Sequence, residues 1–346
     1  MKKDTNPALR ICAVLAVLVV LALAVYTLSR FLRYRASAEP DEPVAAASEA
    51  DKQRTDQTRL ALESGDSIVG EGKRYVPKKG VESYLIMGMD RTEAQIASGR
   101  LSGQADLLLL LVVDVRGHSY QVLQLNRDTV SQINVVSEGG YITGSLFYPI
   151  CLAHSFAPSN EEGCENTVTS VRYLLDDAPI DGYLAVSLES IGLLNEAVGG
   201  VTVTIDKDMT DADPSFTEGA SVKLDARTAE AYVRARMNLG EDNNLSRMQR
   251  QRQFMLSWLT TAQTKTAQDA QFAIRLLRNL EPVLTTNLTE KRLTGLVSDL
   301  AGYENGGFIT IDGEYRWVDD YNFFYADKAS LREAILTLFY TEESES

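Results

Sequence analysis

Two groups of polar residues in this sequence have the types and spacing needed to bind a phosphate. The first group contains Asp90, Asp106 and Arg127, each beside a predicted β-strand. Asp90 follows a strand at residues 84–89, and it reaches the same sheet edge as Arg127 if that strand runs parallel to the one before Arg127. Two carboxylates and an arginine at one edge could hold Mg²⁺ and a phosphate together, because Mg²⁺ prefers carboxylates combined with phosphate oxygens and waters. The alternative is a structural aspartate–arginine pair.

The register of a predicted hairpin brings two of these residues together. Residues 107–114 and 119–125 read as strands, and residues 116–117 mark the turn between them. In an antiparallel hairpin centred on that turn, Asp106 lies opposite Arg127. Cross-strand neighbours of this kind are close enough to form an ion pair.

The second group is basic and lies later in the chain. Arg234 and Arg236 are two residues apart, so they can share one ligand only if their helix ends near them. Arg247 and Gln251 share a face of the next predicted helix, with Arg250 beside them. Guanidinium groups match phosphate oxygens in two-point contacts. The alternative is a solvated basic helix face that forms surface salt bridges in an acidic protein.

Other chemistry-bearing residues give weaker signals. No P-loop, G-x-S-x-G or H-E-x-x-H motif occurs in the sequence. The two histidines exclude a multi-histidine metal site, and His154 is interpreted as structural. Cys151 and Cys164 fit no zinc pattern, so they either pair in an oxidising compartment or remain buried thiols.

The elements that must position these residues alternate between strands and helices along the middle of the chain. Such alternation predicts a layered α/β body. Besides the strands already described, the expected elements are strands near residues 182–186 and 201–205 and helices near 166–175, 190–198, 229–233 and 245–264. Asp225 could cap the helix that contains residues 229–233.

The overall charge argues against one class of partner. The 346 residues carry a formal net charge of −14, and the sequence pI is about 4.7. Nucleic-acid binding needs dense lysine and arginine surfaces that neutralise the phosphate backbone. We therefore expect no nucleic-acid partner.

The N-terminus predicts a membrane attachment. Residues 11–28 form an uncharged apolar run just long enough to span a bilayer. Its N-terminal position favours an uncleaved signal anchor with the body outside the cytoplasm, and the alternative is a signal peptide cleaved near residues 36–38. The expected organisation is a cytoplasmic tail (1–10), a transmembrane anchor (11–29), a linker (30–80), the main domain (81–265) and a C-terminal helical extension (266–346).

Three segments together resemble the LytR-CpsA-Psr family. They are the strand ending Met87-Gly88-Met89-Asp90, the stretch from Asp106 that ends in Asn126-Arg127-Asp128-Thr129, and Leu224 to Gln251 with its Tyr-Val-Arg-x-Arg element. The resemblance covers about residues 81–264, and the tail is similar to an extension in a divergent, clostridial-type branch.

This resemblance implies a mixed central β-sheet sandwiched by helices, with an apolar groove for a polyprenyl chain. Family members transfer a glycopolymer from a polyprenyl-pyrophosphate carrier to peptidoglycan at the membrane. The implied residue roles are metal ligands for Mg²⁺ (Asp90, Asp106), pyrophosphate contacts (Arg127, Arg234, Arg236, Arg247, Gln251) and catalysis (Arg127, Asp128, Asp90).

Some positions depart from the family pattern. Gln104 and Asn126 stand where the family commonly has an arginine and a proline, Asn244 replaces an aspartate, and Ile150 and Cys151 stand where a lysine is expected. We therefore expect a glycopolymer–peptidoglycan phosphotransferase and keep two alternatives. These are a non-catalytic lipid-pyrophosphate binder that regulates or scaffolds envelope assembly, and a lipid-pyrophosphate hydrolase.

Overall fold

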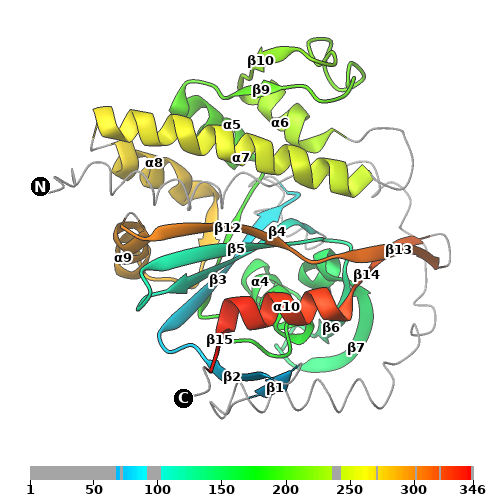
Figure 1. Cartoon of the computed structure of the whole chain (residues 1–346). Helices are drawn as coiled ribbons and strands as arrows, with labels where there is room; N and C mark the ends of the chain where they lie inside the picture. The colour runs from blue at the N-terminus through cyan, green and yellow to red at the C-terminus, as the bar shows by residue number, and fades with distance from the viewer. Residues whose placement is uncertain are drawn as a thin grey trace, which may run out of the picture. The chain divides into compact units, whose positions relative to one another are not determined.

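A computed structural model describes residues 68–70, 73–91, 103–235, 243–269, 272–300, 302–318 and 321–343 (Figure 1). The predicted membrane anchor at residues 11–29 lies outside these ranges. Within them, no helix is both long enough and apolar enough to cross a membrane.

The predicted strand at residues 201–205 belongs to a separate two-stranded sheet, and the other four predicted strands lie in a six-stranded sheet with the order β11-β8-β3-β4-β5-β12. Its members are β3 (Val81–Met89), β4 (Ala105–Asp114), β5 (Ser119–Leu125), β8 (Gly182–Val186), β11 (Leu284–Thr286) and β12 (Glu304–Thr310). All residues of β4 except Asp114 are buried, as expected for an apolar strand covered on both faces. The predicted α/β class with a central sheet is confirmed.

The predicted hairpin turn is present. β5 follows β4 after a turn at residues 115–118, and the two strands are neighbours in the sheet. The Gly117 N–H donates to Asp114 Oδ1 at 2.7 Å, so the aspartate that ends β4 also closes the turn.

The chain divides into two compact units. Unit 1 contains Ile86–Leu108 and Leu184–Glu304. Unit 2 contains Leu109–Tyr183, the described residues up to Leu85 and those from Asn305 onward.

Unit 1 is built around packed helices. They are α5 (Glu189–Val198), α6 (Ala226–Arg234), α7 (Asn243–Gln268), α8 (Phe272–Leu280) and α9 (Glu290–Leu300), accompanied by the 3-10 turn η3 (Glu281–Val283) and the hairpin of β9 (Thr202–Thr204) with β10 (Ser221–Lys223). In Figure 1, α7 runs beside α5 and α6. The buried Trp258 of α7 donates from Nε1 to the Leu194 carbonyl of α5 at 2.7 Å, which fixes the two helices against each other. The predicted end of α5 is also correct, because Gly199 takes the left-handed conformation there (φ 81°).

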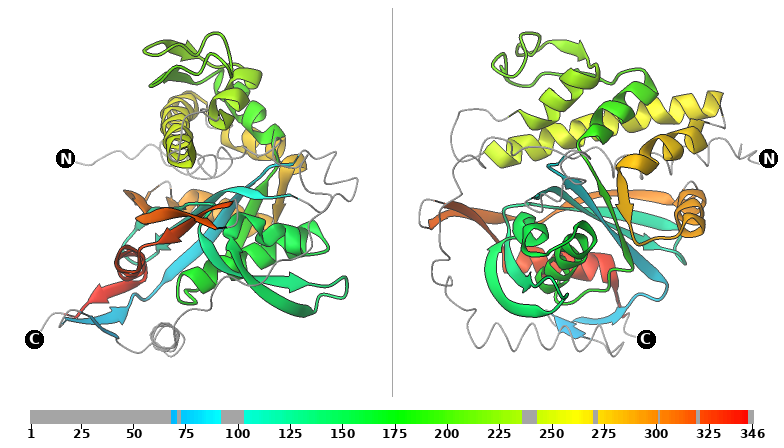
Figure 2. Two further views of the ribbon diagram at one scale, coloured as in Figure 1. Left: turned by 90° about the vertical axis from the view of Figure 1, so that its right-hand side faces the viewer. Right: turned by 180° about the vertical axis from the view of Figure 1, so that it is seen from behind.

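In unit 2, a curved hairpin encloses a helix (Figure 2). β6 (Val130–Val136) pairs with β7 (Ile142–Pro149), and β6 packs on α4 (Asn160–Leu174) and on the 3-10 helix η2 (Ile150–Phe156). The buried Asn166 amide joins these elements, because it donates to the Asn134 and Ala153 carbonyls at 2.8 Å each.

The histidine and the two cysteines considered in the sequence lie in η2 and α4. His154 is buried, contacts Asn160 Oδ1 at 3.1 Å and packs so closely on Gly163 that a Cβ there would lie 2.7 Å from its ring. It is structural, as predicted. Cys151 and Cys164 are both free and buried, so the reading as two thiols is correct and the disulfide reading is not.

The C-terminal extension, expected to be helical, also supplies strands. Besides α8, α9 and α10 (Lys328–Phe339), it contributes β11 and β12 to the six-stranded sheet, the hairpin of β13 (Gly313–Val318) with β14 (Tyr321–Ala326), and β15 (Tyr340–Glu342). The physical reason lies in composition, since the Gly- and Tyr-rich stretch at 303–325 is rich in aromatic residues that favour pleated strands.

The expected linker at residues 30–80 likewise contains ordered strands. β1 (Ile68–Gly70) pairs with β2 (Lys73–Pro77), and β2 pairs with β15. Ion pairs of Lys73 with Glu342 and of Arg74 with Glu343, both at 3.0 Å, flank that pairing. The segment becomes a strand because the distant C-terminus offers it a partner.

Candidate functional site

The two predicted metal-site aspartates lie at the same end of β3 and β4 in unit 1. The Asp90 N–H donates to the Gln104 carbonyl at 3.0 Å, and the Gln104 N–H donates to Asp90 Oδ1 at 2.6 Å. These two hydrogen bonds hold Asp90 beside Gln104, two residues before Asp106 in the chain. The end of β3 and the start of β4 therefore bring the two aspartates to the same part of the sheet.

The chemistry of this pair fits Mg²⁺. Asp106 is buried and Asp90 is partly buried, and a buried carboxylate needs a positive partner. Two carboxylates suffice for Mg²⁺ when phosphate oxygens and waters complete the shell. Among the residues that the structure describes, no group of three or more His, Cys, Asp or Glu side chains could hold a metal by itself.

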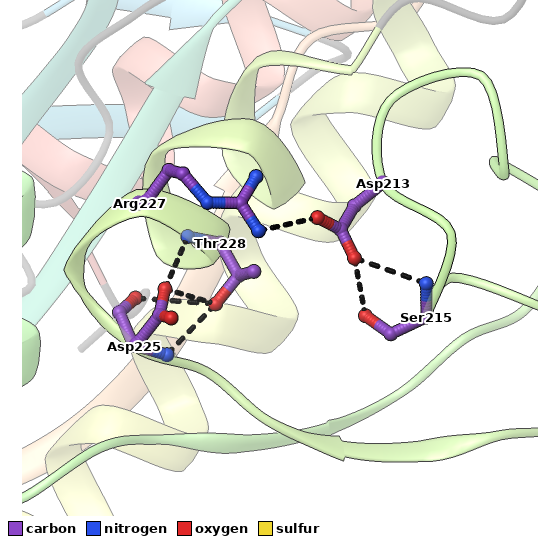
Figure 3. A network of polar contacts seen from close by, with 5 residues as sticks. All are labelled: Asp213, Ser215, Asp225, Arg227 and Thr228. Carbon is purple, nitrogen blue, oxygen red and sulfur yellow. Dashed lines mark hydrogen bonds and ion pairs between the residues drawn. The ribbon is translucent and has the colours of Figure 1, made fainter.

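A second part of unit 1 is set by helix α6. Asp225 caps its N-terminus with a capping box, in which Asp225 Oδ1 accepts from the Thr228 N–H and the Thr228 hydroxyl accepts from the Asp225 N–H, both at 2.7 Å (Figure 3). This arrangement satisfies N–H groups that the first helical turn leaves open. The helix starts at the predicted residue, so Arg234 falls in its last turn.

A neighbouring loop is tied to the same helix by residues that the sequence reading missed. Asp213 accepts from the Ser215 hydroxyl at 2.6 Å, from the Ser215 N–H at 3.0 Å and from Arg227 Nη2 at 2.6 Å (Figure 3). These hydrogen bonds, led by Ser215, lower the pKa of Asp213 to about 2. The Asp-x-Ser pattern is a turn signal that could have indicated this loop.

Between this loop and α6 lies a pocket of about 330 Å³. Its lining combines two arginines, one glutamate and three alanines: Ala212, Arg227, Glu230, Ala231, Arg234 and Ala235. The Asp213–Arg227 pair holds one wall, because Ala212 precedes Asp213 in the loop. Two guanidinium groups in one small pocket are a suitable site for an anion.

The ion pair of Arg234 in this pocket is partly buried. The Arg234 guanidinium pairs with Glu230, one helical turn earlier. Burial lowers the pKa of Arg234 to about 9, and burial followed by the nearby Glu189 raises the pKa of Glu230. Both shifts disfavour the charged forms, so the pair does not fully compensate its own desolvation. A phosphate with more negative charge would stabilise the arginine better.

Arg250 has a structural task that the sequence reading did not assign. This residue is buried, and its guanidinium donates to the Ala235 carbonyl and, at 3.4 Å from Nε, to the Tyr232 carbonyl. These carbonyls belong to the end of α6, where helices leave acceptors open. Arg250 therefore clamps the end of α6 onto α7.

The remaining residues predicted to contact a pyrophosphate are Arg236, Arg247 and Gln251. Arg247 and Gln251 share the buried side of α7 with exposures of 2% and 1%, so the alternative of a solvated basic face is wrong for them. Arg236 lies outside the described residues. Asn244, which replaces a family aspartate, is buried at the start of α7.

In unit 2, the loop after β5 carries the predicted arginine–aspartate pair. Arg127 Nε donates to Asp128 Oδ1 at 3.0 Å, and both side chains are largely buried. Asp128 also accepts at Oδ2 from the Tyr315 hydroxyl at 3.2 Å. The sequence reading missed Tyr315, and only its place in the aromatic stretch at 303–325 could have drawn attention to it.

The predicted pairing of Asp106 with Arg127 stays a prediction. Asp106 belongs to unit 1 and Arg127 to unit 2. What the structure brings together is Asp90 with Asp106 in the first unit and Arg127 with Asp128 in the second.

Comparisons with known proteins place these features in a family. The model of the LytR_cpsA_psr family matches residues 42–338. Biofilm regulatory protein A of Streptococcus mutans is 27% identical over 195 residues, which cover 54% of this chain and 46% of that protein. The polyisoprenyl-teichoic acid–peptidoglycan teichoic acid transferase TagU of Bacillus cereus is 28% identical over 196 residues, 57% of this chain and 56% of that protein.

The chain thus spans about half the length of these two curated relatives. A solved structure described as TagT bound to LI-WTA has the same fold, with a TM-score of 0.55 at 21% identity over 75% of this chain and 90% of that one. Since the family model matches most of its length, the chain belongs to the LytR_cpsA_psr family.

Proposed function

We propose that this protein is a phosphotransferase that moves a glycopolymer from a polyprenyl-pyrophosphate carrier to peptidoglycan. The observation that carries the proposal is the pocket on α6, which the half-buried Arg234 lines together with Arg227. Its lowered pKa indicates a guanidinium that an added anion would stabilise. Membership of the family, and the transferase activity in the name of TagU, support a pyrophosphate as that anion.

The proposed reaction is a displacement at phosphorus. A hydroxyl of the acceptor attacks the phosphorus attached to the glycan, the phosphoanhydride bond breaks, and polyprenyl phosphate leaves with the bonding electron pair. Arg127, Arg234 and Arg247 would stabilise the charge that develops on the phosphate oxygens. The hydroxyl proton would go to a carboxylate, for which Asp128 and Asp90 are the candidates.

Mg²⁺ is proposed at Asp90 and Asp106. When bound, it would neutralise pyrophosphate charge and so favour departure of the phosphate leaving group. Two features support this assignment: both carboxylates lie where β3 ends and β4 begins, and their donor atoms are all oxygens.

The proposed location is the outer face of the cell membrane, with residues 11–29 as a single anchor. The apolar run in the sequence supports this proposal. The carrier's polyprenyl chain also resides in a membrane, so a tethered body would work where its donor is found.

One incubation tests the activity against its two alternatives. The purified body is mixed with Mg²⁺ and a polyprenyl-pyrophosphate glycan, with and without peptidoglycan. Polymer attached to peptidoglycan supports transfer. Free glycan released without an acceptor supports hydrolysis, and intact ligand that stays bound supports a regulator or scaffold.

A matched pair of variants guards this test against contaminating activities. Arg234→Ala removes a pocket arginine, whereas Arg275→Ala removes an exposed arginine that pairs with Asp269 on the surface. Transfer that falls in Arg234→Ala but not in Arg275→Ala belongs to this site. Equal transfer by both variants and the wild type would contradict the assignment.

A further inference from the structure

The hairpin β13–β14 in the C-terminal extension is attached to the loop that carries Arg127 and Asp128. The Phe324 N–H donates to the Asp128 carbonyl at 2.9 Å, and Thr129 and Phe324 form an isolated parallel bridge. Phe324 is buried, and its ring packs edge-on against Tyr315, with centroids 5.2 Å apart. The hairpin therefore has a fixed position on this loop of unit 2.

Four side chains form a connected network at this contact. Arg127 Nε donates to Asp128 Oδ1 at 3.0 Å, and Asn126 Nδ2 donates to the Tyr315 hydroxyl at 3.0 Å. Asn126 Oδ1 in turn accepts from the Asp128 N–H at 3.0 Å. The Tyr315 hydroxyl has two possible acceptors, Asp128 Oδ2 at 3.2 Å and Asn126 Oδ1 at 3.4 Å.

The Tyr315 hydroxyl has one proton, so it can donate to only one of these two acceptors, and the charged acceptor is favoured. A hydrogen bond to a carboxylate is about twice as strong as one to a neutral amide. Tyr315 thus donates to Asp128 and accepts from Asn126. Both carboxylate oxygens of Asp128 are then held, one by Arg127 and one by Tyr315.

We propose that Tyr315 is a positioning residue, which fixes Asp128 and through it the guanidinium of Arg127 for a pyrophosphate ligand. This inference rests on the proposed function, since it concerns the same ligand. It also gives the C-terminal extension a role at the Arg127 loop. Strand β13 of the extension brings Tyr315 to this loop, although Tyr315 lies 187 positions after Asp128 in the sequence.

The physical reason is preorganisation. Ordering a long side chain such as that of Arg127 on binding costs about 0.5–1.5 kcal/mol, and a restraint already present in the unbound protein reduces this cost. A carboxylate held at both oxygens keeps the guanidinium in one orientation before the ligand arrives. The aromatic ring of Tyr315 is itself held by Phe324, so this support is rigid.

The test compares two hydroxyl deletions on one hairpin. Tyr315→Phe removes the contact with Asp128. Tyr325→Phe is the matched control, because Tyr325 pairs with Glu314, faces the other side of the hairpin and lies under Arg316 with 4.9 Å from the guanidinium carbon to the ring centre. Each full-length variant is titrated with a short-chain lipid pyrophosphate, and its thermal midpoint is measured.

Tyr315→Phe should weaken binding about three- to tenfold, the loss expected for one hydrogen bond that acts through a neighbour. Tyr325→Phe should bind like the wild type, and the thermal midpoints should show that both variants are folded at the temperature of the titration. In an Asp128→Asn background, Tyr315→Phe should change affinity less than twofold, because the carboxylate that transmits its effect is gone.

Three outcomes would overturn the inference. They are equal binding by wild type and Tyr315→Phe, an equal loss in Tyr325→Phe, and an undiminished effect of Tyr315→Phe in the Asp128→Asn background. A wild type that binds the lipid but transfers no polymer contradicts the proposed transfer and leaves this inference standing. A wild type that binds no lipid pyrophosphate overturns both.

Discussion

At the scale of single residues, the arginines of α6 and α7 have two different tasks. Arg250 donates its hydrogen bonds to the carbonyls of Tyr232 and Ala235, so its guanidinium is held inside the fold. Arg234 lines a pocket and has a partner whose own pKa is raised by burial. The first arginine therefore contributes to stability, and the second lies at a pocket that an anion could enter.

Arg234→Ala should reduce affinity for a short-chain lipid pyrophosphate by about ten- to a hundredfold. The reason is the loss of one charge-assisted contact, worth about 1.5–3 kcal/mol. Isothermal titration measures the affinity, and thermal melting should show an unchanged or slightly higher midpoint. Arg275→Ala is the control, since that arginine is exposed in a surface pair. A variant that simply unfolds would show that Arg234 is structural.

The affinity of the wild type should also depend on pH. The pKa of Arg234 is lowered to about 9, so the residue is charged at neutral pH and loses its proton as the pH rises through about 9. An anion binds the charged form better, hence affinity should fall between about pH 8 and pH 10, while Arg234→Ala should lack this step. The titrations are made without Mg²⁺, because magnesium hydroxide forms at high pH. A wild-type affinity that stays constant across this range contradicts the shift.

Without ligand, the same shift predicts how stability responds to pH. The unfolded chain keeps Arg234 protonated up to the ordinary arginine pKa, so above about pH 9 the unfolded state binds more protons than the folded state. The contribution of this residue to stability should therefore rise with pH above about 9. Below that pH its charged form carries a constant cost of burial, which agrees with an unchanged or higher melting midpoint in Arg234→Ala.

Asp106→Ala should remove the Mg²⁺-dependent part of lipid-pyrophosphate binding and leave the metal-free part nearly intact. Asp106 is buried, and its carboxylate is proposed as a metal ligand rather than a phosphate contact. Titrations with Mg²⁺ and with a chelator separate the two parts. If Asp106→Ala still responds to Mg²⁺ as the wild type does, the metal lies elsewhere.

At the scale of elements, α6 depends on supports at both ends. Asp225 and Thr228 close its first turn, and Arg250 closes its last turn from α7. The capping box was visible in the sequence only as Asp225 before a helical pattern. The C-terminal clamp was not visible, because no sequence rule tells which basic side chain on one helix reaches the end of another.

Arg250→Met should destabilise the protein by about 1–3 kcal/mol. Methionine keeps much of the buried volume, but it leaves the Tyr232 and Ala235 carbonyls without this donor. Chemical denaturation measures the change, with Arg278→Met on the exposed side of α8 as the control. Equal stability of the two variants would show that water or another group replaces the clamp.

The hairpin β13–β14 shows the limit of reading elements one at a time. Its aromatic residues favour strands, yet the sequence reading placed it in a helical extension. Its contact with the Arg127 loop joins residues that are far apart in the sequence, since Tyr315 and Asp128 are separated by 187 positions. Local pattern predicts what an element is, whereas only packing decides what it touches.

At the scale of the whole molecule, the expected location and partners rest on acidity and on the apolar run at residues 11–28. A net charge of −14 for the full chain favours solubility and argues against nucleic acid as a partner. The pocket arginines are therefore a local exception in an acidic chain, as expected for a site that binds an anion.

Protease added to intact cells after wall removal should degrade the body. The reason is the expected orientation of residues 11–29, with the N-terminus in the cytoplasm and the remaining chain outside. Immunoblotting of the body measures the loss, with a cytoplasmic protein as the control. A protected body would contradict the orientation, and a mature N-terminus near Glu39 would show a cleaved signal peptide instead.

The sequence by itself determined the α/β class, the strands around Asp90, Asp106 and Arg127, the start of α6 and the family. These features follow from local hydrophobic patterns, caps and motif order, which need no knowledge of distant contacts. Only the tertiary structure decided the roles of Arg250, Asp213 and Tyr315, the pairing of β2 with β15 and the free state of Cys151 and Cys164. Each of these depends on which segments meet in space, because the free energy of a hydrogen bond or a strand pair is gained only when the fold supplies its partner.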